Sequence, residues 1–349
     1  MQLKGKISIK GNGLFSYKGT ESEKNRIYAR GIGTFHKDEL ILNINEAFLL
    51  NEVFSIDFEL NEMPSFDISN YVVFRELFMK GFKYIKDIQE RDIKASITDG
   101  VIKIYKSHDF NIDAKAVVLG QDKQFAIIKG DKDLYYKYWF GQYGSYKKHY
   151  GNLFLLDFYE CQFLKELNVL SGSFRPYYRF FDDIYSIYKD WRSKGYVLKT
   201  GFKFGGDFRI YEPNAQPDKG MHSKHIIHVF PKGLFLDAEQ WSRAIRVCHG
   251  VKKSYIIAIP KSKEKIVKFK PDGLIKRNNE IYVLKILKQQ DFVRGSMLAS
   301  ALDYCIKNNL PLLLCLVDRE AAVTFYKAER IKLENSDNIY YEINWVNMK

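Results

Sequence analysis

The chain has 349 residues, of which 46% are hydrophobic and 15% aromatic, and it carries a formal net charge of +13 with an isoelectric point near 9.2. This length predicts two or three domains, and the hydrophobic content excludes an intrinsically disordered chain. The excess of lysine and arginine favours a polyanionic partner, because each cation placed against a phosphate releases a condensed counterion. A basic surface that serves solubility alone would give the same charge.

The cysteine content and the hydropathy pattern predict a soluble, cytoplasmic protein. The four cysteines lie in apolar runs without CxxC spacing, which predicts reduced core residues: Cys161, Cys248, Cys305 and Cys315. The first residues lack the apolar run of a signal peptide, and no stretch reaches about 18 consecutive apolar residues. No membrane segment is therefore expected.

The N-terminal region predicts a small α+β unit of about 95 residues. Residues 1–45 contain short alternating runs divided by glycine and polar turns, which indicates a twisted sheet. Two stretches with helical spacing follow. The first is NINEAFLLNEVFSIDF, with Asn45 as the candidate N-cap, and the second is DISNYVVFRELFMKGF, which ends before Gly81.

The same helical signature returns further along the chain. LLDFYECQFLKELN matches INEAFLLNEVF, and IYKDWRSKGYVLK matches VFRELFMKGFKYI. Glu160 follows Glu46 by 114 residues, and Gly195 follows Gly81 by the same 114. One offset for two segments predicts an internal repeat rather than a chance likeness of amphipathic helices. The first copy then diverges after Lys86, where its second half is missing.

That second half is predicted at the other end of the chain. EIYVLKILK and ALDYCIKNNLPLLLCLVD align without gaps on SKHIIHVFP and AIRVCHGVKKSYIIAIPK, both at an offset of 57 residues. In this alignment Asn279 stands where His222 is expected and Leu310 where Lys253 is expected. The C-terminal copy thus keeps the packing pattern and loses the residues capable of chemistry.

These repeats predict an α/β (α+β) fold with small mixed sheets and packed helices. One complete unit is flanked by two half-units, which together form a degenerate copy. The predicted segments are an N-terminal half-unit (1–95), the first part of the complete unit (96–184), its catalytic domain (185–277) and a C-terminal structural half-unit (278–349).

Tyr211, His222 and Lys253 are the candidate catalytic residues. A tyrosine that loses a proton, a histidine that gives one and a lysine that stays positive are what cleavage of an RNA phosphodiester without a metal requires. Tyr211 would need cationic neighbours to act near neutral pH, for which Arg209 and the two lysines Lys252 and Lys253 are candidates. The structural alternatives are a packing tyrosine, one of 24, and a solvated lysine pair at a helix end.

No metal site is predicted around these residues. His222 and His228 would lie about 20 Å apart on one strand, and His225 would face the other side. His225 and His228 are expected at the surface or the rim. Asp207 and Glu212 remain as candidate ligands of a metal-dependent nuclease, although their spacing is generic.

Three segments together resemble the archaeal tRNA-splicing endonucleases: KTGFKFGGDFRIYE, HSKHIIHV and RVCHGVKKS. The resemblance is specific over about residues 185–260, and the half-copy, whole copy, half-copy order is similar to the three-unit, homodimeric form of that family. It implies cleavage of precursor tRNA at a bulge-helix-bulge motif, giving a 2′,3′-cyclic phosphate and a 5′-hydroxyl without a metal or other cofactor. Carried over by position, Tyr211 is the general base, His222 the general acid and Lys253 the stabiliser of the transition state.

The resemblance also implies contacts with RNA and with a second subunit. Arg246 matches an arginine that stacks on a flipped bulge base, and the second such cation is expected near Lys276. Lys252 departs from the family's usual arginine before the catalytic lysine and is expected to bind RNA. An acidic loop with Asp318 and Glu320 is expected to enter a basic pocket on the partner's catalytic unit. A hairpin turn with solvated charges is the alternative there, and a non-catalytic RNA-binding subunit is a further alternative for the whole chain.

Overall fold

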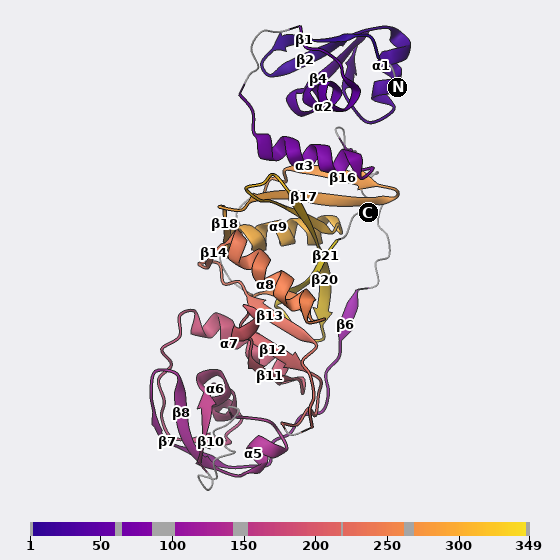
Figure 1. The fold of residues 1–349 in the computed structure, drawn as a ribbon. Coiled ribbons are helices and arrows are strands. Elements are labelled where there is room, and N and C mark those ends of the chain that lie inside the picture. Colours follow the sequence, from indigo (N-terminus) through magenta and orange to yellow (C-terminus); the bar gives the residue numbers. More distant parts are fainter. Residues whose placement is uncertain are drawn as a thin grey trace.

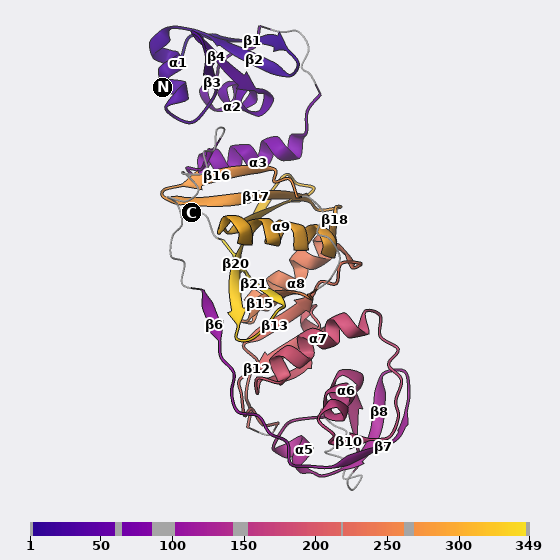
Figure 2. The same cartoon turned by 180° about the vertical axis from the view of Figure 1, so that it is seen from behind.

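The computed structural model describes residues 3–59, 65–85, 102–141, 153–217, 219–261 and 269–346. The molecule is elongated, with a small sheet at each end and a large sheet between them (Figures 1 and 2). The predicted mixed α/β class is confirmed. Within the described part of the chain, no helix is long and apolar enough to cross a membrane. All four cysteines are buried and free of disulfides.

The N-terminal sheet has the strand order β1-β2-β4-β3. Its strands are β1 (Lys6–Gly11), β2 (Leu14–Lys18), β3 (Thr34–His36) and β4 (Glu39–Asn43), and the helices are α1 (Glu21–Tyr28), α2 (Ile44–Phe54) and α3 (Ile68–Met79). The N-cap of α2 is Asn43 and not Asn45. The Asn43 side chain accepts from the N–H of Glu46, and Glu46 accepts from the N–H of Asn43, which is a capping box.

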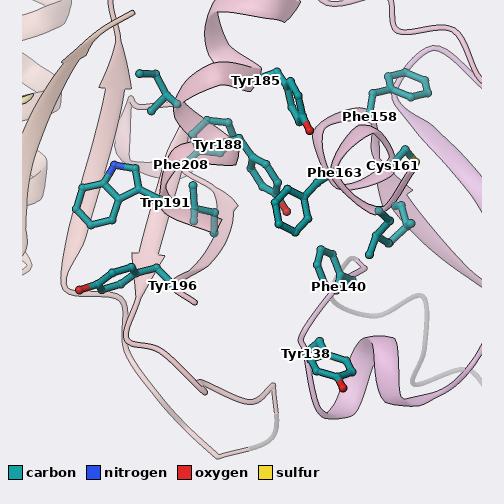
Figure 3. Packing of buried hydrophobic residues seen from close by; sticks show 14 of the residues in the cluster. Tyr138, Phe140, Phe158, Cys161, Phe163, Tyr185, Tyr188, Trp191, Tyr196 and Phe208 are labelled. Carbon is teal, nitrogen blue, oxygen red and sulfur yellow. The ribbon is translucent and has the colours of Figure 1, made fainter. Parts of the chain in front are cut away.

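The second small sheet has the order β10-β7-β8-β9. It consists of β7 (Ala116–Gln121), β8 (Phe125–Gly130), β9 (Leu153–Asp157) and β10 (Leu170–Ser171), with helices α5 (Asp133–Tyr136), α6 (Phe158–Glu166) and α7 (Phe181–Arg192). Figure 3 shows the aromatic core that joins this sheet to the central one. Tyr188 of α7 packs between Phe163 of α6 and Phe208, with ring centroids 6.0 and 5.6 Å away.

The correspondence at 114 residues extends to individual hydrogen bonds. The capping box of α6 is formed by Asp157 and Glu160, as that of α2 is formed by Asn43 and Glu46. Both glutamates are buried and accept a glycine N–H, from Gly33 to Glu46 at 2.9 Å and from Gly141 to Glu160 at 3.1 Å. The two helix pairs therefore share the polar contacts that fix their N-termini.

Within the described residues, the central sheet has eleven strands. Ten follow the order β11-β12-β13-β15-β21-β20-β19-β17-β16-β5, and β6 pairs with β20. The strands are β5 (Lys83–Tyr84), β6 (Lys103–Tyr105), β11 (Val197–Thr200), β12 (Phe208–Tyr211), β13 (His225–Val229), β15 (Ser254–Ile259), β16 (Gly273–Arg277), β17 (Glu280–Lys288), β19 (Leu312–Val317), β20 (Val323–Leu333) and β21 (Ile339–Trp345). Two helices, α8 (Ala238–Gly250) and α9 (Gly295–Asn308), and a two-stranded sheet of β14 (Phe235–Asp237) and β18 (Phe292–Arg294) complete this region.

The strand order is palindromic about the pair β21-β20. β13 and β15 are parallel with α8 between them in the chain, and β17 and β19 are parallel with α9 between them. Their registers correspond at the predicted offset of 57 residues, since Ile226 pairs with Tyr255 and Val283 with Leu312. At the centre, Tyr255 pairs with Ile343, which pairs with Ala328, which pairs with Leu312. The two copies are thus related by a pseudo-two-fold axis.

The N-terminal part of the chain joins the far edge of this sheet. Lys83 and Tyr84 of β5 pair with Lys276 and Ile275 of β16, as Val197 and Leu198 of β11 pair with Tyr211 and Ile210 of β12. The segment 273–277, which the sequence analysis grouped with the catalytic domain, therefore pairs with the C-terminal copy. Lys276 occupies the position that corresponds to Tyr211.

The backbone of Gly295, in the C-terminal copy, lies directly against the backbone of the first copy at Pro231 and Leu234, and a substitution at Gly295 tests this contact. Its N–H donates to the Leu234 carbonyl at 3.0 Å, and a Cβ there would lie 1.9 Å from the Pro231 carbonyl oxygen. We expect Gly295→Ala to lower the free energy of unfolding by ~1–3 kcal/mol in urea titrations, because backbone must move. The matched control is Gly250→Ala at the end of α8, where a Cβ meets nothing within 4 Å. It should change stability by less than ~1 kcal/mol, and equal losses in both variants would contradict the contact.

Candidate active site

Three strand ends bring the predicted residues to one edge of the central sheet. Tyr211 is the last residue of β12, the segment 221–224 leads into β13, and Lys253 directly precedes β15. β12 is antiparallel to β13 and β13 is parallel to β15, so the end of the first meets the beginnings of the other two. Lys224 links the three, because its N–H donates to the Ile210 carbonyl at 3.0 Å and its carbonyl accepts from the Ser254 N–H at 3.1 Å.

Tyr211 is held by an aromatic contact and faces a cation. Its ring is buried and lies 4.7 Å from the ring of Trp139, with Val197 and Ala215 in the same cluster. The Arg209 guanidinium lies 5.8 Å from the centroid of the Tyr211 ring. Residues two apart on a strand share a face. The structure therefore places one of the expected cationic neighbours beside the phenol.

Lys253 points into the sheet edge, whereas Lys252 does not. The Lys253 ammonium donates to the Ser223 carbonyl and lies 5.8 Å from the ring of Phe204. Burial and the charge of Arg209 lower the pKa of Lys253. Lys252 is exposed and adopts a left-handed conformation with φ of +56°. The lysine that contacts the segment after His222 is thus Lys253.

The three histidines differ from the sequence-based expectation. His222 is exposed and precedes β13, which begins only at His225. The expectation that His225 and His228 lie at the surface or rim is wrong, because both are half-buried and hydrogen-bonded. His228 Nδ1 is 2.6 Å from the Tyr255 hydroxyl. His225 contacts the Ser254 hydroxyl, and burial lowers the pKa of His225 to about 4.

The candidate metal ligands Asp207 and Glu212 lie at opposite ends of β12. Asp207 accepts the Val229 N–H at 2.7 Å, and Glu212 forms an ion pair with Lys224 at 2.8 Å. Asp207 and Glu212 are five positions apart along an extended chain, which separates them by roughly 16 Å and turns them to opposite faces. They do not form one chelating pair. Nor do the described residues contain any group of three potential metal ligands.

The remaining predicted residues are distributed over the molecule. Arg246 is exposed on α8. Lys276 lies on β16, six strands away from β13, so it does not meet the candidate catalytic residues within the chain. Asp318 and Glu320 are exposed in the turn between β19 and β20. Asp318 Oδ1 accepts the N–H groups of Glu320 and Ala322, both at 2.9 Å, which fixes that turn. Residues 262–268 of the basic loop lie outside the described residues.

Two aromatic residues near the site were missed by the sequence analysis. Trp139 covers Tyr211, and the Tyr105 hydroxyl lies 3.3 Å from His225 Nε2 with the two rings at right angles. Tyr105 belongs to β6, which runs along the side of the central sheet (Figure 2). A three-residue strand and a single aromatic residue have no recognisable sequence pattern. The contacts of Tyr105 and Trp139 are therefore seen only in the folded structure.

The comparisons with known proteins place the site in a family. The model of the tRNA intron endonuclease catalytic C-terminal domain matches residues 181–268. A tRNA-splicing endonuclease from Thermococcus onnurineus is 32% identical over 158 residues, which cover 41% of this chain and 85% of that protein. This chain belongs to the tRNA-splicing endonuclease family.

Other members of the tRNA-splicing endonuclease family align over shorter segments. The Methanothermobacter thermautotrophicus protein is 36% identical over 90 residues, covering 26% of this chain and 52% of its own length. The Methanococcoides burtonii protein is 45% identical over 74 residues, covering 21% of each chain. The chain thus spans about half the length, or less, of several of the relatives it matches. Tyr211, His222 and Lys253 all lie inside the family match.

The burial of His225 predicts a loss of stability in acid. Its pKa is about 4 in the fold against an ordinary 6.5. The unfolded chain therefore takes up the proton first as the pH falls. The free energy of unfolding is therefore undiminished above the unfolded pKa of 6.5. It decreases as the pH falls from there to about 4, by up to ~1.4 kcal/mol per pH unit for one proton. We expect the urea midpoint of His225→Gln to fall less steeply over this range than that of the wild type. His36→Gln, at an exposed position on β3, is the control, and identical slopes for His225→Gln and wild type would contradict this account.

Proposed function

We propose that the chain is the catalytic subunit of a tRNA-splicing endonuclease. It cuts precursor tRNA at bulge-helix-bulge intron boundaries in the cytoplasm, without a metal ion, and leaves a 2′,3′-cyclic phosphate and a 5′-hydroxyl. The observation that carries the proposal is the meeting of Tyr211, the His222 segment and Lys253 at one sheet edge inside the matched catalytic domain.

Each residue has a role that its surroundings support. Tyr211 takes the proton of the 2′-hydroxyl, with the Arg209 guanidinium 5.8 Å from the centroid of its ring. The freed 2′-oxygen attacks the phosphorus, and the bond from phosphorus to the 5′-oxygen breaks. His222, exposed to substrate, gives its proton to that leaving oxygen. Lys253 stabilises the charge on the phosphoryl oxygens, and its lowered pKa reflects the partly desolvated position this role requires.

The C-terminal copy supports a chemical role for these residues rather than a packing role. The Lys253 N–H donates to the Cys248 carbonyl at 2.9 Å, and the Leu310 N–H donates to the Cys305 carbonyl at 3.0 Å, so the backbone is the same in both copies. Leucine serves this position equally well for packing. The lysine is therefore dispensable for the fold, which points to one active site per chain.

One active site per chain fits a homodimer. Two cuts in one RNA call for two active sites related by a two-fold axis. We assign the contact to Asp318 and Glu320 of the fixed, exposed turn, which would enter a basic surface of the partner. The half-units 1–95 and 278–349 would together form a degenerate copy of the complete unit. The strand 273–277 pairs with β17 and β5, so we assign it to the degenerate copy and end the complete unit before residue 273. Arg246 and Lys252 would contact RNA near the cut, and Lys276 would do so only from a second subunit.

The direct test is cleavage of a bulge-helix-bulge RNA by the purified chain in EDTA, followed by analysis of the ends. We expect a 2′,3′-cyclic phosphate and a 5′-hydroxyl at both boundaries. Activity that EDTA abolishes and magnesium restores would support a metal-dependent nuclease instead. Binding of the RNA without cleavage would support a non-catalytic RNA-binding subunit.

Three variants separate the catalytic roles. His222→Ala should lower the single-turnover rate by roughly 10²–10⁴-fold. Lys253→Ala should lower it by about 10²–10³-fold, with RNA binding retained in both. An RNA with sulfur in place of the leaving 5′-oxygen needs no general acid, so His222→Ala should cut it at close to the wild-type rate.

Lys252→Ala is the matched control for Lys253→Ala. Because Lys252 is exposed beside the site and would contact RNA, its loss should weaken RNA binding but keep most of the single-turnover rate at saturating RNA. A slow His222→Ala reaction on the sulfur-substituted RNA would remove histidine from the role of general acid. Equal losses in the two lysine variants would remove the distinction between them.

Asp318→Lys combined with Glu320→Lys tests the dimer contact. The reversed charges should repel a basic partner surface, so sedimentation should show monomers and cleavage should fall at the same chain concentration. Asp303→Lys combined with Glu329→Lys, on other parts of the C-terminal half, is the charge-matched control. A dimeric and active Asp318→Lys/Glu320→Lys variant would exclude this turn from the interface.

A further inference from the structure

Phe202 is the most exposed large hydrophobic side chain in the described part of the molecule, with 86% of its surface open to solvent. It begins the 3-10 turn η1 (Phe202–Phe204), which joins β11 to β12 within the matched catalytic domain. Single exposed aromatic residues are common on protein surfaces. The rigidity of this turn and the residues around it distinguish Phe202 from such cases.

The backbone of the turn is fixed by hydrogen bonds. Gly201 donates to the Asp207 carbonyl at 2.7 Å, Phe204 to the Gly201 carbonyl at 2.8 Å, and Gly205 to the Phe202 carbonyl at 3.1 Å. The Phe202 ring is thus presented from an ordered scaffold. Because the backbone of the turn is already ordered, little of its conformational entropy is lost when a ligand covers the Phe202 ring.

The turn lies against Lys253. Phe204, two residues after Phe202, has its ring 5.8 Å from the Lys253 ammonium, and its carbonyl contacts the Cys248 thiol at 3.6 Å. Lys203, between the two phenylalanines, is exposed. Phe202 therefore lies two residues from the ring that contacts Lys253, the group that would hold the phosphate.

The turn is also linked to Tyr211 through Arg209. Arg209 Nε donates to the Thr200 carbonyl at 2.8 Å, while its guanidinium lies 5.8 Å from the Tyr211 ring. Thr200 in turn accepts the Phe202 N–H with its hydroxyl at 3.4 Å. The backbone of the turn that carries Phe202 is therefore linked by contacts of Thr200, Arg209 and Phe204 to both candidate catalytic groups.

An exposed ring on a turn that carries Lys203 and is contacted by Lys253 and Arg209 is suited to an unpaired nucleobase and its phosphates, because the base stacks on the ring and the cations neutralise the backbone. A base inside a helix has both faces covered and cannot stack on a side chain. We infer that Phe202 stacks on an unpaired base next to the cleaved phosphodiester, an inference that rests on the proposed endonuclease function. Phe202 is then an RNA-binding residue beside the cut, and its contribution is to affinity.

Binding of a non-cleavable RNA, with a 2′-deoxy nucleotide at each cut, tests this role in the full-length chain. We expect Phe202→Ala to weaken binding by roughly 5- to 150-fold, the range for loss of one stacked base. Phe202→Trp should bind like the wild type, because it keeps a flat aromatic face. At saturating cleavable RNA the single-turnover rate of Phe202→Ala should stay close to the wild-type rate, so that KM changes and kcat does not.

An abasic nucleotide, placed at each unpaired position in turn, identifies the base. When the stacked base is removed, the wild-type chain should bind the abasic RNA as weakly as Phe202→Ala binds the intact RNA. Phe202→Ala itself should bind the abasic RNA and the intact RNA with the same affinity. Phe292→Ala is the control, since Phe292 is 61% exposed on β18 of the C-terminal copy, and it should bind like the wild type.

Two results would overturn the stacking role: wild-type affinity in Phe202→Ala, or a loss in Phe202→Ala that remains at full size on every abasic RNA. Cleavage by the wild-type chain is measured in parallel. A chain that cleaves while Phe202→Ala binds normally refutes the stacking alone, whereas a wild-type chain that does not cleave refutes the proposed function.

Discussion

The pairing of β20 with β21 is the constraint on which the rest of the structure depends. β15 of the catalytic domain receives its second neighbour, β21, from residues 339–345, and β19 of the C-terminal copy receives β20. Without β21, β15 would present a row of unpaired backbone groups beside Lys253. The sheet of the matched catalytic domain is therefore continuous with that of the C-terminal copy.

The position of the candidate site follows from this sheet. Because β13 and β15 are parallel, both must start at the same edge, and the antiparallel β12 must end there. The helix α8 between the two parallel strands delivers Lys253 to that edge through the bond to Cys248. The aromatic core of α6 and α7 packs on Phe208, on the face of β12 opposite to Arg209 and Tyr211. The candidate site is thus built at strand ends, and the C-terminal copy has the same strand ends with different side chains.

Much of this arrangement could be predicted from the sequence because it repeats. The offsets of 114 and 57 residues reappear as the shared capping boxes of Glu46 and Glu160 and as matched strand registers. The burial of His225 and His228 and the contacts of Tyr105 and Trp139 could not be predicted. They result from contacts between segments far apart in the chain, such as Lys103 with Ile331, and no local pattern records which segments will meet. The place of Lys276 differs, because it lies in the hairpin of β16 and β17, a local feature that the sequence analysis missed.

The palindromic sheet has a consequence for synthesis of the chain. The ribosome completes β15 at Ile259, but its neighbour β21 begins only at Ile339. Likewise β5, which begins at Lys83, cannot pair until β16 has been made from Gly273 onward. At ordinary elongation rates β15 stays without that neighbour for roughly 4–16 s. During that time the most apolar strand of the catalytic domain has an open edge. Chaperone binding, or pairing with the same strand of another nascent chain, would compete with folding at this stage.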